Sequence, residues 1–293
     1  MLWLYLALTA YFINAIVFII DKYLLSAQIP KYHAYAFGVS VLSLASLFLI
    51  PFGVSWQSLS YFLIAVSSGA AFFVGLIFFY KVIKKSDVSV AATQVGTISA
   101  IFTYIFSVII LGDALSSVNL SAFLFFVFGI YLLGRTEKHV FISAILAGLL
   151  GGIYYVLMKY LFNESNFING LFWTRMGFIG AAFVSLCSRE VRQEIKFSFR
   201  HVSGKSQVLF VFNKFLAGIG FIILYFSISL GNVSLVNALL GVQFMFIFLL
   251  AIIFRTRMPE VKEKLGKNIL ISKTVGIVSV ALGFLLLFLH NNG

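Results

Sequence analysis

The chain has 293 residues, of which 61% are hydrophobic and 10% are charged, and its formal net charge is +12. Soluble domains carry about a quarter charged residues, so this composition excludes a soluble protein and predicts an all-α membrane protein with several transmembrane helices. Nucleic acid is not an expected partner, because the basic residues lie between apolar runs, where they interact with anionic lipid headgroups. The single cysteine, Cys187, excludes an intramolecular disulfide and a cysteine-based metal cluster.

Ten apolar runs are expected to form transmembrane helices. The first lacks a basic leader and a small-residue cleavage site, so we expect it to be a spanning helix and not a cleaved signal. The longest polar stretch, residues 188–207, is expected to be a loop. In chain order the runs cover residues 2–20, 32–51, 58–81, 88–111, 118–134, 140–162, 167–187, 207–229, 233–254 and 270–289.

The segment from Gly75 to Gly96 occurs a second time, from Gly220 to Gly241. Each copy has a small polar residue that is expected to cap a second helix: Asp87 in the first copy and Asn232 in the second. The two copies therefore indicate a duplicated half. Aligned without a gap, they share Gly75/Gly220, Ile77/Ile222, Tyr80/Tyr225, Ile83/Ile228, Val88/Val233, Ser89/Ser234 and Gly96/Gly241.

The repeat extends beyond this segment and divides the chain into two five-helix units, residues 1–137 and 138–293, which together form one membrane domain. Because each unit has an odd number of helices, the second enters the membrane in the opposite sense. This inverted repeat is typical of secondary transporters. The further matches are Asp21–Leu24 with Met158–Leu161, Gly38 with Gly177, Ser46 with Ser185, Leu47 with Leu186 and Gly129 with Gly283.

The distribution of basic residues predicts the topology. All Lys and Arg residues except Lys159, Arg175 and Lys214 lie in or beside the first, third, fifth, seventh and ninth loops. The positive-inside rule places these odd-numbered loops in the cytoplasm and both termini outside. We therefore expect a multi-pass protein of the cell membrane (plasma or inner membrane).

Taken together, these features resemble the drug/metabolite transporter (DMT) superfamily, specifically its EamA-type transporters. The resemblance covers nearly the whole chain. It implies ten helices in an inverted repeat and alternating access between the two halves. The segments that carry it are GLLGGIYYVLMKY (148–160), FWTRMGFIGAA (172–182) and the hairpin 75–112 followed by Gly112 and Asp113.

Charges inside a bilayer cost several kcal/mol, so intramembrane cations are candidate binding residues. Arg175 lies about 12 Å into its helix and can bind a carboxylate or phosphate, unless it forms a structural ion pair. Lys159 either reaches the headgroups or faces the same cavity as Arg175, with Glu164 as the nearby acid. Lys214 is expected to extend its side chain to the headgroups.

Neutral polar side chains are either cavity-lining residues or contacts between helices. The site is expected between the halves, formed by spans 1, 3, 4, 6, 8 and 9, with Arg175 approaching from span 7. The glycines of the repeated segment are expected to be packing points that govern how the halves move, and its tyrosines to lie at interfacial or gating positions. The candidates for binding are Asn14, Gln94, Asn237, Gln243, Tyr154 and Tyr155, and those for packing or gating are Gly75, Gly96, Gly220, Gly241, Tyr80 and Tyr225.

Proton coupling is not indicated, because the acids lie near helix ends, where Asp21, Asp87 and Asp113 are expected to cap helices or pair with lysines. Enzyme and metal-binding motifs are absent, and no cofactor is expected. The sequence thus predicts a secondary transporter, monomeric or homodimeric, for small polar metabolites that are anionic or zwitterionic. The alternatives are a non-transporting receptor or scaffold on the same fold and, third, a lipid-modifying membrane enzyme.

Overall fold

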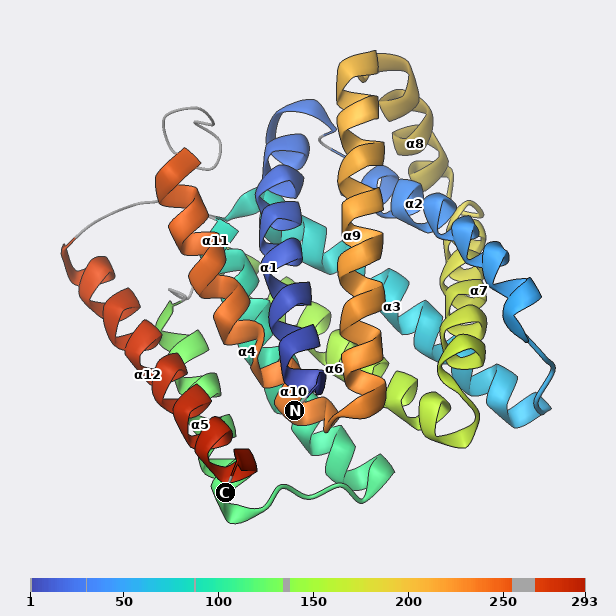
Figure 1. Ribbon diagram of the computed structural model, residues 1–293. Coiled ribbons are helices and arrows are strands. Elements are labelled where there is room, and N and C mark those ends of the chain that lie inside the picture. Colours follow the sequence, from blue (N-terminus) through green and yellow to red (C-terminus); the bar gives the residue numbers. More distant parts are fainter. Residues whose placement is uncertain (1, 30, 87, 134–137, 255–266, 293) are drawn as a thin grey trace.

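The computed structural model describes all residues except 1, 30, 87, 134–137, 255–266 and 293 (Figure 1). Asp87 and the predicted boundary between the halves at residue 137 lie outside these described residues. The fold is all-α. Its helices are α1 Leu2–Tyr23, η1 Leu24–Gln28, α2 Tyr32–Leu42, η2 Ser43–Phe52, α3 Leu59–Lys85, α4 Val88–Phe106, η3 Ser107–Leu111, α5 Ser117–Leu133, η4 Lys138–Val140, α6 Phe141–Glu164, α7 Phe167–Ser185, α8 Arg189–His201, α9 Gly204–Leu230, α10 Val233–Ala238, α11 Leu240–Phe254 and α12 Lys267–Asn292.

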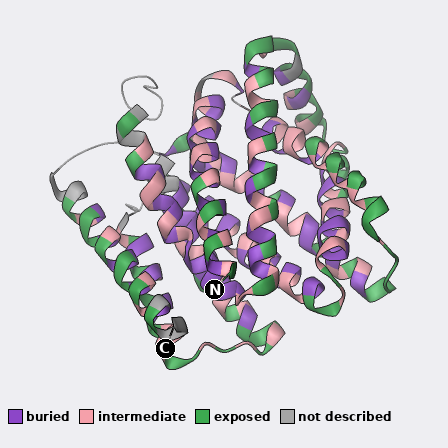
Figure 2. Cartoon of the chain, viewed as in Figure 1, coloured by how far each residue is buried: buried purple, intermediate pink, exposed green. Residues whose placement is uncertain are grey.

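Within the described residues, 8 helices are long and apolar enough to cross a membrane. Two shorter apolar stretches, Ser117–Leu132 and Ile271–Leu287, belong to α5 and α12, which pack along each other. Exposed residues lie mainly on the outer faces of the helices (Figure 2), and they include large apolar side chains such as Phe48 and Phe215. Apolar outer faces of this kind suit contact with lipid, so the chain is a multi-pass membrane protein.

The polar stretch after α7 is not a loop, as the sequence predicted, but the helix α8. Its apolar and polar residues fall on different faces, so it packs one face on α2 and exposes the other. Glu194 of α8 ties it to the start of α2, with its carboxylate 2.8 Å from His33 Nδ1 and 3.6 Å from Lys31 Nζ. We call this side of the bundle the α8 end, and the opposite side, where α1 starts and α12 ends, the terminal end (Figure 1).

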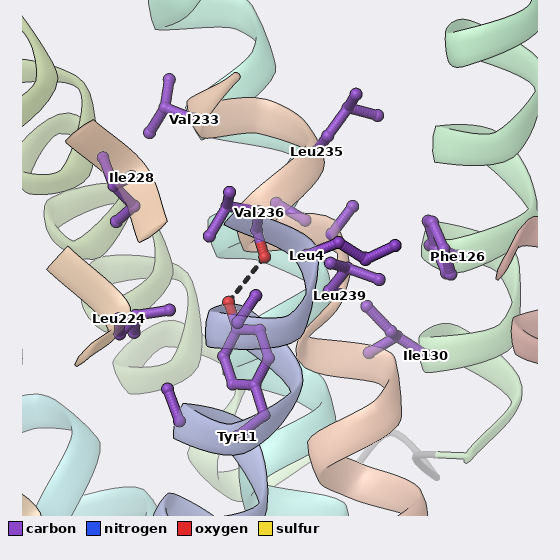
Figure 3. Close-up of a cluster of buried hydrophobic side chains, with 14 of the residues drawn as sticks. Leu4, Tyr11, Phe126, Ile130, Leu224, Ile228, Val233, Leu235, Val236 and Leu239 are labelled. Carbon is purple, nitrogen blue, oxygen red and sulfur yellow. Dashed lines mark hydrogen bonds between the residues drawn. The ribbon is translucent and has the colours of Figure 1, made fainter. Parts of the chain in front are cut away.

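The predicted span 233–254 is interrupted at Leu239, which separates α10 from α11. Asn232 caps α10, as predicted: its Oδ1 accepts from Ser234 N at 2.9 Å and from Leu235 N at 3.1 Å. In the last turn of α10 the carbonyl of Val236 accepts a hydrogen bond of 2.6 Å from the Tyr11 hydroxyl of α1 (Figure 3). This bond fixes the interrupted helix against the apolar core around Tyr11.

The repeated glycines make equivalent contacts in the two parts of the chain. A Cβ at Gly75 of α3 would lie 3.1 Å from Leu150 Cβ and 3.8 Å from Gly151 N of α6. A Cβ at Gly220 of α9 would lie 2.6 Å from Asn14 Oδ1 of α1. When Asp21 is aligned with Met158, Asn14 is aligned with Gly151. The close approach of α3 to α6 is therefore repeated between α9 and α1.

Candidate functional site

A cavity of about 310 Å³ lies at the centre of the bundle. Residues of α1, α3, α4, α6, α9 and α11 line it, and α2, η2 and α7 complete its wall. The interruption before α11 brings Leu240 and Phe244 to this wall, beside Ser99 of α4. Interrupted helices at the middle of a membrane bundle are typical positions for substrate sites.

Among the described residues that line the cavity, Arg175 is the charged residue on the side towards the terminal end. Its Nη2 donates a hydrogen bond of 2.8 Å to the Tyr225 hydroxyl. The guanidinium carbon lies 5.2 Å from the centre of the Tyr225 ring and 5.5 Å from that of Phe72, so aromatic faces stabilise the positive charge. In the described part of the chain no carboxylate lies within ion-pairing distance of Arg175, so the predicted alternative of a structural ion pair is absent there.

The opposite side of the cavity, towards the α8 end, holds an ion pair between Lys214 of α9 and Asp21 of α1. Lys214 Nζ lies 2.5 Å from Asp21 Oδ1, and the same oxygen accepts from Asn213 Nδ2 and from the Tyr35 hydroxyl, each at 2.6 Å. The exposed fraction is 2% for Asp21 and 8% for Lys214. This pair joins one helix from each predicted half.

The prediction that Lys214 extends to the headgroups is therefore wrong. Its amine has a carboxylate partner inside the bundle, so it stays buried. Asp21 lies in the last turn of α1 and pairs with a lysine, as predicted, but the pair is buried inside the bundle. The apolar run ends at residue 20, whereas α1 and η1 continue to Gln28, so Asp21 lies seven residues before the end of a longer helical segment. Lys214 was not predicted as a cavity residue from the sequence. Its position within a helical segment was the available signal.

The remaining binding candidates divide into two groups. Tyr155 lines the cavity, while Tyr154 is buried next to it and stacks on Phe72 with ring centres 4.4 Å apart. Lys159 is not among the lining residues, and its amine donates to the Ser229 carbonyl at 3.0 Å. Buried polar residues outside the lining are Asn14, Gln94, Asn237 and Gln243.

Asn237 forms hydrogen bonds to a neighbouring helix and does not line the cavity. Its Nδ2 donates to Thr103 Oγ1 at 2.5 Å and to Ser99 Oγ at 3.1 Å, so it joins α10 to α4. This is the helix-contact alternative to the predicted binding role.

Of the four repeated glycines, Gly75 and Gly96 line the cavity, which the prediction of pure packing points did not include. Gly220 and Gly241 have packing contacts: a Cβ at Gly241 would lie 2.9 Å from Val280 of α12. Tyr80 and Tyr225, expected at interfacial or gating positions, are buried inside the bundle with exposed fractions of 3% and 0%. Each lies against a buried cation.

No group of three or more His, Cys, Asp or Glu side chains that could hold a metal ion occurs in the described ranges. No protein-family model matches the chain, and no curated protein matches it either. Solved structures do match. One, described only as the crystal structure of a protein, has a TM-score of 0.66 and 15% sequence identity over 96% of this chain and 95% of its own. At this identity the match shows that the fold is a known one.

Proposed function

We propose that the chain is a secondary transporter of small anionic or zwitterionic metabolites, of the EamA type within the DMT superfamily. The observation that carries the proposal is Arg175, a cation in a central cavity that has a tyrosine hydroxyl as its hydrogen-bond partner and no described carboxylate within ion-pairing distance. A buried guanidinium is most stable with a bidentate acid partner. A substrate carboxylate or phosphate supplies this partner.

The proposed mechanism is alternating access between two inverted five-helix halves. The repeated contacts of Gly75 with α6 and of Gly220 with α1 support this arrangement, because each contact joins one half to the other and an inverted repeat makes such a contact twice, with the halves exchanged. The pair Lys214–Asp21 and the pair Arg175–Tyr225 lie on opposite sides of the cavity. In this mechanism each pair controls access from its own side of the membrane.

The proposed orientation places the α8 end in the cytoplasm and the terminal end outside, in the plasma or inner membrane. The basic residues of the odd-numbered loops support it through the positive-inside rule. The odd-numbered loops include the segment with α8, which contains Arg189, Arg192, Lys196 and Arg200.

A receptor or scaffold on the same fold is the second candidate, and it requires no bound metabolite. The cavity favours the transporter, because no carboxylate among the described residues pairs with Arg175. An enzyme would require a pair of catalytic polar groups, and the sequence has no recognisable catalytic motif, so we do not propose one.

The test is a thermal-shift screen of amino acids, organic acids, nucleosides and amines on purified protein, followed by uptake of each hit into proteoliposomes. We expect acidic compounds to stabilise the protein and to be transported, and Arg175→Gln to remove both effects. Lys159→Gln is the matched control, because it removes a cation outside the cavity lining. Binding and uptake that are unchanged in Arg175→Gln would overturn the proposal.

A further inference from the structure

The wall of the cavity has one exposed side. Among its described lining residues, the exposed ones are Leu42 of α2, Ala45 of η2, and Gly218 and Ile222 of α9. Two of these residues lie on the continuous segment of α2 and η2, and the other two lie on α9. In Figure 1, α2 begins beside α9 and runs away from it, and η2 continues in the same direction. The cavity therefore opens sideways, between η2 and α9.

The opening lies at mid-membrane depth. Gly218 is 14 residues after Gly204 in the 27-residue helix α9, or about 21 Å along a helix of about 40 Å. A bilayer has a hydrocarbon core about 30 Å thick, so the middle of a spanning helix faces acyl chains. A Cβ at Gly218 would have no atom within 4 Å, which agrees with an open edge. The opening therefore leads to lipid chains.

The repeat explains why the cavity is open between α2 and α9, while the equivalent contact between α7 and α3 is closed. At the equivalent contact, Gly69 of α3 packs against the backbone of α7 at Thr174 and Phe178, and Gly177 of α7 packs against Val66. The positions aligned with Ala65 and Gly69 are Phe210 and Lys214. Gly38 of α2 is the position aligned with Gly177. A Cβ at Gly38 would lie 2.9 Å from the Phe210 ring, so a side chain of α9, and not its backbone, is the neighbour there.

These two large side chains hold α2 away from α9. The closed contact between α3 and α7 has small residues at both positions, so those two helices meet along their backbones. The sideways opening therefore has a basis in the sequence of α9.

Arg175 lies near the opening. Its partner Tyr225 follows Ile222 by three residues, so both lie on one face of α9. Leu49 of η2 and Leu171 of α7 also line the cavity. A ligand bound at Arg175 through an acidic group can thus extend an apolar chain past Ile222 into the bilayer.

We infer that the site binds a single-chain amphiphilic carboxylate, with its acidic group at Arg175 and its apolar chain in the opening between η2 and α9. This inference rests on the proposed function and narrows its substrate class. A cavity of about 310 Å³ is at the lower limit of ligand pockets, about 300–1,000 Å³, which favours one chain over a diacyl lipid.

The experiment uses the full chain in phosphatidylcholine nanodiscs and a decanoate probe with a photoreactive diazirine at its terminal carbon. We expect saturable labelling of η2 and α9 at the opening. Unlabelled decanoate should compete at concentrations at least about tenfold lower than butyrate, because its extra methylenes leave water. Competition by dioctanoyl phosphatidylglycerol that is stronger than by decanoate would overturn the single-chain assignment.

Two variants test the opening itself. Gly218→Trp should weaken decanoate competition about tenfold more than that of butyrate, because it fills the opening and not the Arg175 site. Gly180→Trp is the matched control, since Gly180 is also exposed, has no atom within 4 Å of an added Cβ and does not line the cavity. Ala45→Trp narrows the opening from η2 and should act as Gly218→Trp does, so the test does not depend on one variant folding.

The outcomes separate this inference from the proposed function. If decanoate and butyrate compete equally and both lose affinity in Arg175→Gln, the amphiphile inference is wrong and the anion transporter stands. If Gly218→Trp and Gly180→Trp behave alike, the opening is not used. If Arg175→Gln changes the competition of neither decanoate nor butyrate, the proposed function is wrong as well.

Discussion

Tyr80 and Tyr225 occupy the same position in the two copies of the repeated segment, and each has its hydroxyl next to a different buried cation. The Tyr80 hydroxyl is 3.4 Å from Lys214 Nζ, and the Tyr225 hydroxyl is 2.8 Å from Arg175 Nη2. The difference between the two sites is the acid: Asp21 neutralises Lys214, whereas no described carboxylate neutralises Arg175. The repeat thus places one tyrosine beside each cation, although the cations themselves do not align: Lys214 is aligned with Gly69 and Arg175 with Ala36. Lys214 has a carboxylate partner in the protein, and in the proposed function the substrate supplies the partner of Arg175.

Replacing Arg175 by Lys should weaken anion binding about tenfold, although the charge is kept. An ammonium group is a point charge and does not reproduce the bidentate geometry of a guanidinium. The measurement is the dissociation constant of a transported acid in detergent. Lys159→Arg should bind as the wild type does, and equal affinity in Arg175→Lys would show that charge alone is sufficient.

Separating the buried ion pair should destabilise the protein. Asp21→Asn or Lys214→Met each leaves one buried charge without its partner, with an expected cost of about 3–5 kcal/mol. The double variant removes both charges and should recover much of this loss. Thermal unfolding of the four proteins gives the coupling free energy, and a double variant whose loss equals the sum of the single losses would contradict a direct interaction.

Gly177→Leu should destabilise the contact between α3 and α7. The added side chain would overlap the backbone at Val66, because even a Cβ at Gly177 would lie only 2.6 Å from Val66 Cα. Gly180→Leu, three residues further on the same helix, has open space and should have no effect. Folded yield and melting temperature in detergent compare the two variants. Similar values would mean that the close contact does not contribute to stability.

Gly96→Leu should impair transport and leave membrane insertion normal. An added side chain would meet the ring of Phe244, which also lines the cavity, and the ring can move only at the expense of the cavity. Uptake is measured per inserted molecule. Gly204→Leu, at the start of α9 with no atom within 4 Å of an added Cβ, is the control, and full uptake by Gly96→Leu would contradict this role.

The positions of the membrane helices could be predicted because length and apolar composition determine them. Every predicted run coincides with a helical segment, with the run 233–254 divided at Leu239. Helix ends were less predictable. The first apolar run ends at residue 20, before the charged residues Asp21 and Lys22, but α1 and η1 continue through them to Gln28. The amphipathic helix α8 was missed because its composition is that of a polar loop, although its apolar and polar residues fall on different faces of a helix.

The candidate site could be predicted only in part. Arg175 was found because a cation far from either helix end requires a reason to be there. Which face of a helix turns to the cavity could not be read in segments that are apolar on all sides, so Asn237 and Gln243 were proposed for a cavity that they do not line. The ion pair Lys214–Asp21 joins residues 193 positions apart, and neither position indicates its partner.

The most direct test of alternating access measures the accessibility of two cavity positions from opposite sides of the membrane. In a Cys187→Ser background, single cysteines replace Ala92, towards the α8 end, and Leu171, towards the terminal end; both residues are buried and line the cavity. Each is labelled with a membrane-impermeant maleimide from either side, with and without a transported acid. Alternating access predicts that substrate increases labelling at one position and decreases it at the other. A labelling pattern that substrate does not change at either position would contradict the transporter.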